Sequence, residues 1–102
     1  MKCSSYYLFF ETISNKTRMN IVESLLKSPK SVNALCEDIK EEQSKVSHSL
    51  KRLMDCNFLN VERDGKKKIY SLNNETVVPI LNLVDKHVSK FCNKECIKAK
   101  SK

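Results

Sequence analysis

Two cysteines near the end of the sequence have the spacing of a thiol site. Cys92 and Cys96 are four residues apart, which places both thiols on one face of a helix. The neighbouring Lys90, Lys94 and Lys98 favour thiolates, which are nucleophiles and ligands for soft metals. A disulfide between the two is expected to unwind the last helical turn. The pair predicts a thiol sensor, either of a soft metal or metalloid or of oxidation; the alternative is two thiols without a role.

A second group of side chains has the chemistry of a nucleic-acid contact. Four apolar residues at helical spacing predict a helix that ends near Asn57: Val46, Leu50, Leu53 and Met54. Its opposite face carries hydrogen-bonding and cationic groups: Gln43, Ser44, Lys45, Ser47, His48 and Lys51. Ser, Gln and His hydrogen-bond to base edges or phosphates, and Lys suits phosphates. The alternative is an ordinary solvated helix face.

The single glycine of the chain predicts a β-hairpin beside that helix. Asp64-Gly65 separates "FLNVE" from "KKIYSL", two segments in which apolar and polar residues alternate. Asp-Gly is preferred in type I′ turns, which need positive φ at both central positions. Cations surround this turn: Arg63, Lys66, Lys67 and Lys68. They are interpreted as contacts to a polyanion, and the alternative is a solubilising charge run.

Four further helices complete the predicted architecture. Residues 5–13 form a short first helix, Asn15 caps a second that stops at "KSPK", and Val32, Leu35, Cys36 and Ile39 mark a short third. The last runs from about residue 74 to 92, with Pro79 in or near its first turn. One side of it is apolar: Val77, Leu81, Val84, Val88 and Phe91. The predicted class is mainly α with a β-hairpin wing: a winged helix-turn-helix of five helices and a two-stranded antiparallel wing.

Composition limits the function classes. The 102 residues predict one domain, 1–102, with a core over about 8–91 and a frayed cysteine- and lysine-containing tail over 92–102. A net charge of +7 favours a polyanionic partner. Without a long apolar run or a signal peptide, the expected location is cytoplasmic, with no membrane partner. The odd count of five cysteines favours free thiols, metal ligands or redox groups over a disulfide framework. No catalytic spacing or phosphate-binding loop is present, so an enzyme is not expected.

Two segments resemble a known family. "ISNKTRMNIVESLL" and "KVSHSLKRLMDCNFLNVERDGKKKIYSL" are similar to the ArsR/SmtB winged-helix repressors over roughly residues 8 to 90. In that family the counterpart of "VSHSLKRL" is the DNA-recognition helix. The resemblance implies a homodimer built by the first and last helices, which binds a palindromic operator in double-stranded DNA and releases it when an inducer binds. The apolar side of the last helix independently suits a dimer interface.

The metal sites of the family are not retained. Its third-helix site has a Cys-x-Cys pair before a third cysteine, and Ser31 and Asn33 replace the pair, leaving Cys36 as a core thiol. At its zinc site in the last helix only His87 matches, because Asn74, Thr76 and Lys90 occupy the other ligand positions. One imidazole does not hold zinc, so His87 is interpreted as a surface or interface histidine.

The terminal thiols remain as the candidate sensor. Some members of the family bind trivalent arsenic through cysteines near the end of the last helix, which by resemblance points to Cys92 and Cys96. A third thiol is needed, and Cys3 of either chain is the candidate if the first and last helices pack together across the dimer. No cofactor is required, apart from a soft metal or metalloid at these cysteines. Cys56 closes the predicted recognition helix.

The predicted function is therefore a homodimeric, sequence-specific DNA-binding regulator: a repressor released by a thiol-directed signal. Two alternatives stay open. One is a winged-helix module that docks protein and never reads DNA, and the other is a DNA-binding regulator without a small-molecule inducer.

Overall fold

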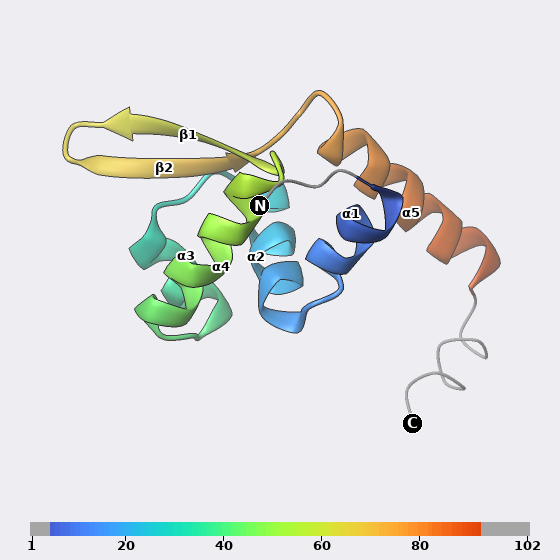
Figure 1. Ribbon diagram of the computed structural model, residues 1–102, viewed down its shortest axis with the longest axis horizontal. Coiled ribbons are helices and arrows are strands. Elements are labelled where there is room, and N and C mark those ends of the chain that lie inside the picture. The colour runs from blue at the N-terminus through green and yellow to red at the C-terminus, as the bar shows by residue number, and fades with distance from the viewer. Residues whose placement is uncertain (1–4, 93–102) are drawn as a thin grey trace.

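The computed structural model describes residues 5–92, which form five helices and one two-stranded sheet. The elements follow one another as α1 (Tyr6–Ile13), α2 (Lys16–Lys27), α3 (Val32–Ile39), α4 (Gln43–Asp55), β1 (Leu59–Asp64), β2 (Lys67–Leu72) and α5 (Val77–Phe91). The hairpin projects from one end of the molecule and α5 from the other (Figure 1). The predicted fold class is confirmed.

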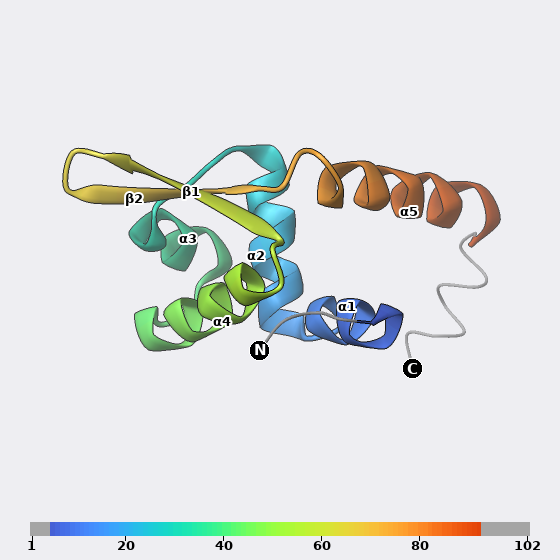
Figure 2. The ribbon, with the colours of Figure 1, turned by 45° about the horizontal axis from the view of Figure 1, so that its top comes forward.

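Helices α2, α3 and α4 pack together and supply most of the core (Figures 1 and 2). Ile21, Leu35 and Val46, one from each helix, are completely buried. Phe58, directly after α4, is 1% exposed and stacks on Phe9 of α1, with the ring centroids 4.8 Å apart. This aromatic pair attaches α1 to the core.

The helix ends follow local side-chain signals. Ser5, Asn15 and Ser31 each accept a hydrogen bond from the backbone N–H three residues later, as N-caps do. Helix α4 ends at Asp55, and Asn57, two residues later, has a φ of 59°. The N–H groups of Asn57 and Phe58 donate back to carbonyls of the last turn at 3.0 Å each, the Schellman arrangement. The predicted cap at Asn15 and the end near Asn57 are confirmed.

The turn of the wing is shifted by one residue from the prediction. Asp64 pairs with Lys67, so the two central residues are Gly65 and Lys66 rather than Asp64 and Gly65. Gly65 has a φ of 68°, whereas Lys66 is not in the positive-φ region. Positive φ at the first central position alone is typical of a type II′ turn, and the type I′ prediction was wrong. Asp64 extends the strand because its backbone still pairs across the hairpin.

The base of the wing is tied to the loop between α2 and α3. The backbones of Lys30 and Tyr70 exchange hydrogen bonds of 3.0 and 2.8 Å. The Lys30 ammonium donates to the Ser24 carbonyl at 2.6 Å, and the Ser24 hydroxyl donates to the Asp38 carboxylate of α3. That hydrogen bond, followed by the charges of Lys27 and Lys30, lowers the pKa of Asp38. The hairpin is therefore anchored to the helical core by backbone pairing and a polar corner.

Helix α5 begins three residues later than predicted. The Asn73 side-chain oxygen accepts the backbone N–H groups of Glu75 and Thr76 at 2.9 and 3.3 Å, and so holds residues 74–76 in a turn. Pro79 lies in the first turn of the helix, as predicted. Val77 and Leu81 pack into the core, and the rest of α5 extends away from it (Figure 2). Neither α5 nor another helix within residues 5–92 is long and apolar enough to cross a membrane.

Replacing Gly65 tests the role of the turn. A Cβ at this position would meet no atom within 4 Å, so the cost of Gly65→Ala comes from the backbone alone. We expect a loss of about 1 to 2 kcal/mol in the free energy of unfolding, because a Cβ disfavours positive φ. Gly65→Asn should lose less, since Asn tolerates positive φ better. Urea unfolding at one fixed protein concentration measures both; equal stability of all three proteins would contradict the turn assignment.

Candidate nucleic-acid interface

Helix α4 separates its apolar and polar residues onto opposite faces. Val46, Leu50 and Leu53 are at most 2% exposed. All six residues predicted to contact DNA are exposed: Gln43, Ser44, Lys45, Ser47, His48 and Lys51. Ser49, which the prediction did not include, is 6% exposed on the inward side. The structure thus brings the six predicted side chains together on one solvent-facing surface, which we call the α4 face.

Two of the six side chains of the α4 face interact with neighbouring acidic residues. The Ser44 hydroxyl donates to the Glu42 carboxylate at 2.7 Å, and the Lys45 ammonium lies 3.5 Å from the Glu41 carboxylate. Such exposed ion pairs stabilise a fold by only about 0.2 to 1 kcal/mol, and the pair exchanges readily for another anion. The other four have no side-chain hydrogen bond or ion pair to any residue in the described range 5–92: Gln43, Ser47, His48 and Lys51.

A cationic hollow joins the wing to the helix-turn-helix. It has a volume of about 320 Å³ and is lined by Ser31, Val32, Asn33, Gln43, Arg63, Lys66, Lys67 and Lys68. The four wing cations were predicted together; the start of α3 was not assigned to this surface from the sequence. Both α3 and α4 begin beside the hollow, so their N-terminal backbone dipoles add to its positive potential. The N-cap signal at Ser31 locates that helix start, but nothing local in the sequence places it against the wing.

The predicted thiol site falls mostly outside the described residues. Cys92 is a free, half-buried thiol at the C-cap of α5, and the two other predicted members, Cys96 and Cys3, lie outside residues 5–92. Cys36 is also free and packs, half-buried, against the core. Cys56 is in a disulfide, so the expectation of free thiols, metal ligands or redox groups fails for this cysteine. Within the described part of the chain, no three His, Cys, Asp or Glu side chains are grouped as metal ligands.

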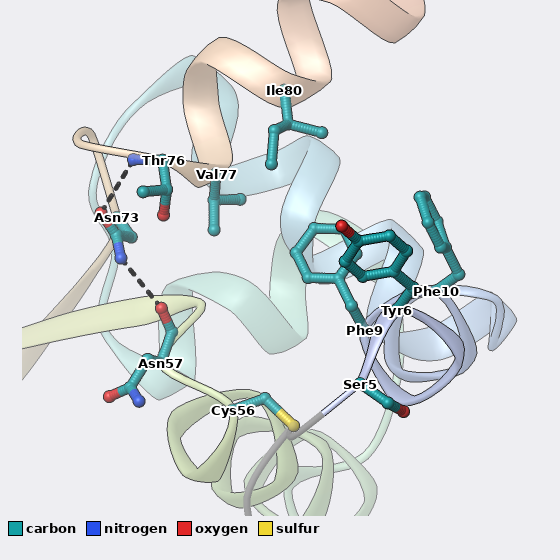
Figure 3. Close-up of a pocket in the computed structure, with 10 residues that line it drawn as sticks. All are labelled: Ser5, Tyr6, Phe9, Phe10, Cys56, Asn57, Asn73, Thr76, Val77 and Ile80. Carbon is teal, nitrogen blue, oxygen red and sulfur yellow. Dashed lines mark hydrogen bonds between the residues drawn. The ribbon is translucent and has the colours of Figure 1, made fainter.

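Exposed apolar side chains gather at the end of the molecule opposite the wing. Between α1 and the start of α5 lies a cavity of about 740 Å³, with Tyr6, Phe9, Phe10, Val77 and Ile80 among its walls (Figure 3). Its polar edge is occupied: the Asn73 amide donates to the Asn57 carbonyl at 3.0 Å. Further apolar side chains of both helices face solvent: Tyr7, Leu83, Val84, Val88 and Phe91.

The predicted apolar side of α5 therefore divides into two parts. Val77 and Leu81 belong to the core of the chain itself and have almost no surface left for a partner. Val84, Val88 and Phe91 are 46%, 38% and 64% exposed. His87 is exposed as well, and its ring lies 5.2 Å from that of Phe91.

The helix order, the paired hairpin and the solvent-facing polar side of α4 define a winged helix-turn-helix protein. The family model described as bacterial regulatory protein, arsR family, matches residues 15–61. The helix-turn-helix part of the chain, residues 15–61, therefore belongs to the ArsR family.

Two curated relatives agree with this assignment, and a solved structure shares the fold. A probable mercury resistance operon repressor of Streptomyces lividans is 29% identical over 75 residues, 74% of this chain. The nodulation protein NolR of Rhizobium meliloti is 32% identical over 73 residues, 72% of this chain. The aligned part spans 60% of the length of each of these curated relatives. A homodimeric winged helix-turn-helix DNA-binding domain from Mycobacterium bovis superposes with a TM-score of 0.74 at 20% identity, covering 79% of this chain and 75% of that one.

Stability measurements test whether the side chains of the α4 face contribute to the stability of the fold. Ser47→Ala and His48→Ala should each change the free energy of unfolding by less than about 0.5 kcal/mol, because neither side chain is buried. The matched control, Leu50→Ala in the same helix, should lose about 2 to 5 kcal/mol through the cavity it leaves. Thermal or urea unfolding provides the comparison. A large loss in either polar variant would mean that the α4 face supports the fold.

Proposed function

We propose that this protein is a homodimeric, sequence-specific DNA-binding transcriptional repressor. The observation that carries the proposal is the α4 face lying beside four exposed wing cations, joined by one cationic hollow. A helix of this kind enters the major groove, where Gln, Ser and His reach base edges. Wing lysines and Arg63 neutralise phosphates of the adjacent backbone, which positions the helix without reading sequence.

The dimer is proposed to form through α1 and α5. These two helices carry most of the large exposed apolar side chains and border the large cavity, and they lie at the opposite end of the molecule from the wing (Figures 1 and 3). A second copy related by two-fold symmetry covers such a surface with the same surface of its own. The two α4 helices then reach half-sites about one helical turn apart, so a palindromic operator suits the symmetry. The homodimeric state of the Mycobacterium bovis domain supports this arrangement.

We infer repression rather than activation from the description of a relative. The Streptomyces lividans relative is described as a probable repressor of a mercury resistance operon, and its match spans 74% of this chain. A repressor needs a signal for release, and we propose that the signal acts on thiols, with Cys92 and Cys96 as the sensing pair. Cys92 supports this because it is a free thiol at the end of the proposed dimer helix. A regulator without an inducer is the alternative outcome.

Salt dependence separates the contributions of wing and helix. The Lys66→Ala/Lys67→Ala/Lys68→Ala variant should bind all duplexes more weakly, with a flatter plot of log K against log salt, because each phosphate contact contributes about 0.9 to the slope. Ser47→Ala and His48→Ala should keep the slope but lose discrimination between a selected duplex and a scrambled one, each good base contact being worth about 1 to 3 kcal/mol. Fluorescence anisotropy across a salt series measures both.

The comparison uses the duplex that the wild-type protein selects from a random pool. Sedimentation of the wild-type protein without DNA should give twice the chain mass. If the wild type selects no sequence, the α4 face does not read DNA, and a protein-docking module becomes the better interpretation. A monomer at concentrations that bind DNA would contradict the dimer.

Titration of the thiols tests the release signal. Arsenite, cadmium, zinc or a mild oxidant should weaken binding of the wild type to its selected duplex, about 5- to 150-fold for an ordinary allosteric coupling. The Cys92→Ser/Cys96→Ser variant should bind DNA normally and not respond, whereas the control Cys36→Ser should respond as the wild type does. A response retained in the double variant would move the sensor elsewhere, and no response in the wild type would favour a regulator without an inducer.

A further inference from the structure

A polar cluster connects the back of α4 to α1 and α2. The Arg52 guanidinium of α4 donates through Nη2 to the Glu11 carboxylate at 3.3 Å and to the Thr12 hydroxyl at 3.5 Å. Thr12 is fully buried, and its hydroxyl donates to the Leu8 carbonyl of its own helix at 2.7 Å. Arg52 thus reaches from the recognition helix to two consecutive residues of α1.

A second arginine closes the same cluster from α2. The Arg18 guanidinium donates through Nε to the Thr12 carbonyl and through Nη2 to the Glu11 carbonyl at 3.5 Å. Burial, and then the positive charge of Arg52, lower the pKa of Arg18, whereas Glu11 raises it. Two like charges are therefore held close together, with the Glu11 carboxylate as the acidic member that offsets them.

The arrangement is poorly suited to a purely stabilising role. The Arg52 side chain is 25% exposed and that of Glu11 47%, and ion pairs so open to water contribute little to stability. In addition, the Arg52 Nε is buried with no hydrogen-bond acceptor among residues 5–92, which carries a desolvation cost. What the cluster does provide is direction. Arg52 directly follows Lys51 of the α4 face. Holding Arg52 against α1 therefore fixes the rotation of α4 and the direction in which Lys51 points.

We propose that Arg52 and Glu11 are positioning residues, which set the orientation of the recognition helix relative to the proposed dimer helix α1. The inference rests on the proposed DNA-binding function of the α4 face. In a dimer joined through α1, this link also fixes how the two α4 helices face successive major grooves. Neither residue is assigned a contact with DNA.

The decisive variant is Glu11→Gln, because positioning and simple electrostatics predict opposite signs. Removing a negative charge from a DNA-binding protein normally strengthens its binding to all duplexes. If Glu11 positions α4, binding to the wild-type-selected duplex should instead weaken about 3- to 10-fold, while binding to a scrambled duplex stays equal or strengthens. The slope of log K against log salt should not change. The matched control is Glu23→Gln on exposed α2 surface, where Glu23 has no hydrogen bond or ion pair within the described range.

Arg52 is tested by its salt slope. Arg52→Met should reduce discrimination as Glu11→Gln does and leave the slope unchanged, whereas an arginine that bound phosphate would lower the slope by about 0.9. The double variant should lose no more discrimination than either single variant, because both changes break one link. Thermal unfolding of each variant confirms that the comparison is made on folded protein, and Glu11→Gln, which keeps the side-chain shape, provides the result if Arg52→Met unfolds.

Three outcomes would overturn the inference: Glu11→Gln behaving like Glu23→Gln, a lowered slope in Arg52→Met, or additive losses in the double variant. Each of these requires that the wild type discriminates between the two duplexes. Failure of the wild type to do so would instead reject the proposed function.

Discussion

The burial of one row of apolar side chains on α4 is the constraint on which the rest of the structure depends. Val46, Leu50 and Leu53 recur at intervals of three or four residues and are nearly inaccessible to solvent. Only one rotation of the helix buries all three, so the same packing decides which polar side chains face outward. The left-handed Asn57 then turns the chain straight into Phe58 and β1. The orientation of the α4 face and the starting point of the wing therefore have one common cause.

The core is too small to cover every apolar surface of the chain. It takes in the first turns of α5 through Val77 and Leu81 and stops there, although apolar residues continue along the same side of the helix. On α1 the division is similar, because Phe9 stacks on the core while Tyr6 is 88% exposed. Exposed aromatic and aliphatic surface of this extent is unfavourable in water unless a second surface covers it. The fold thus has a core that supports the α4 face. Separately, it has an apolar surface on α1 and α5 that lies outside this core and suits a second copy of the chain.

Local signals in the sequence predicted most of the fold, and contacts between distant residues account for what was missed. Asn15, Pro79 and the helical periodicities act within a few residues, so the helices could be predicted, as could the six side chains of the α4 face. The turn was misplaced by one residue because Asp64 is compatible with either a strand or a turn, and pairing with Lys67 decides between them. Periodicity alone also could not divide the apolar side of α5 between the core and a partner. The polar contacts of Arg52 join residues 40 and 41 positions apart, beyond any local pattern.

The two parts of the proposed interface are held by different kinds of interaction, and this has a functional consequence. The wing is fixed by backbone pairing along β1 and β2 and at Lys30, and no carboxylate within residues 5–92 forms an ion pair with its lysines. Their mutual repulsion is tolerable because all are exposed and screened by salt. Helix α4, by contrast, has acidic residues at its start, Glu41 and Glu42, which engage Lys45 and Ser44. Charge is therefore concentrated in the wing and hydrogen-bonding capacity on α4, so affinity for a polyanion and discrimination among sequences are separable properties of this chain.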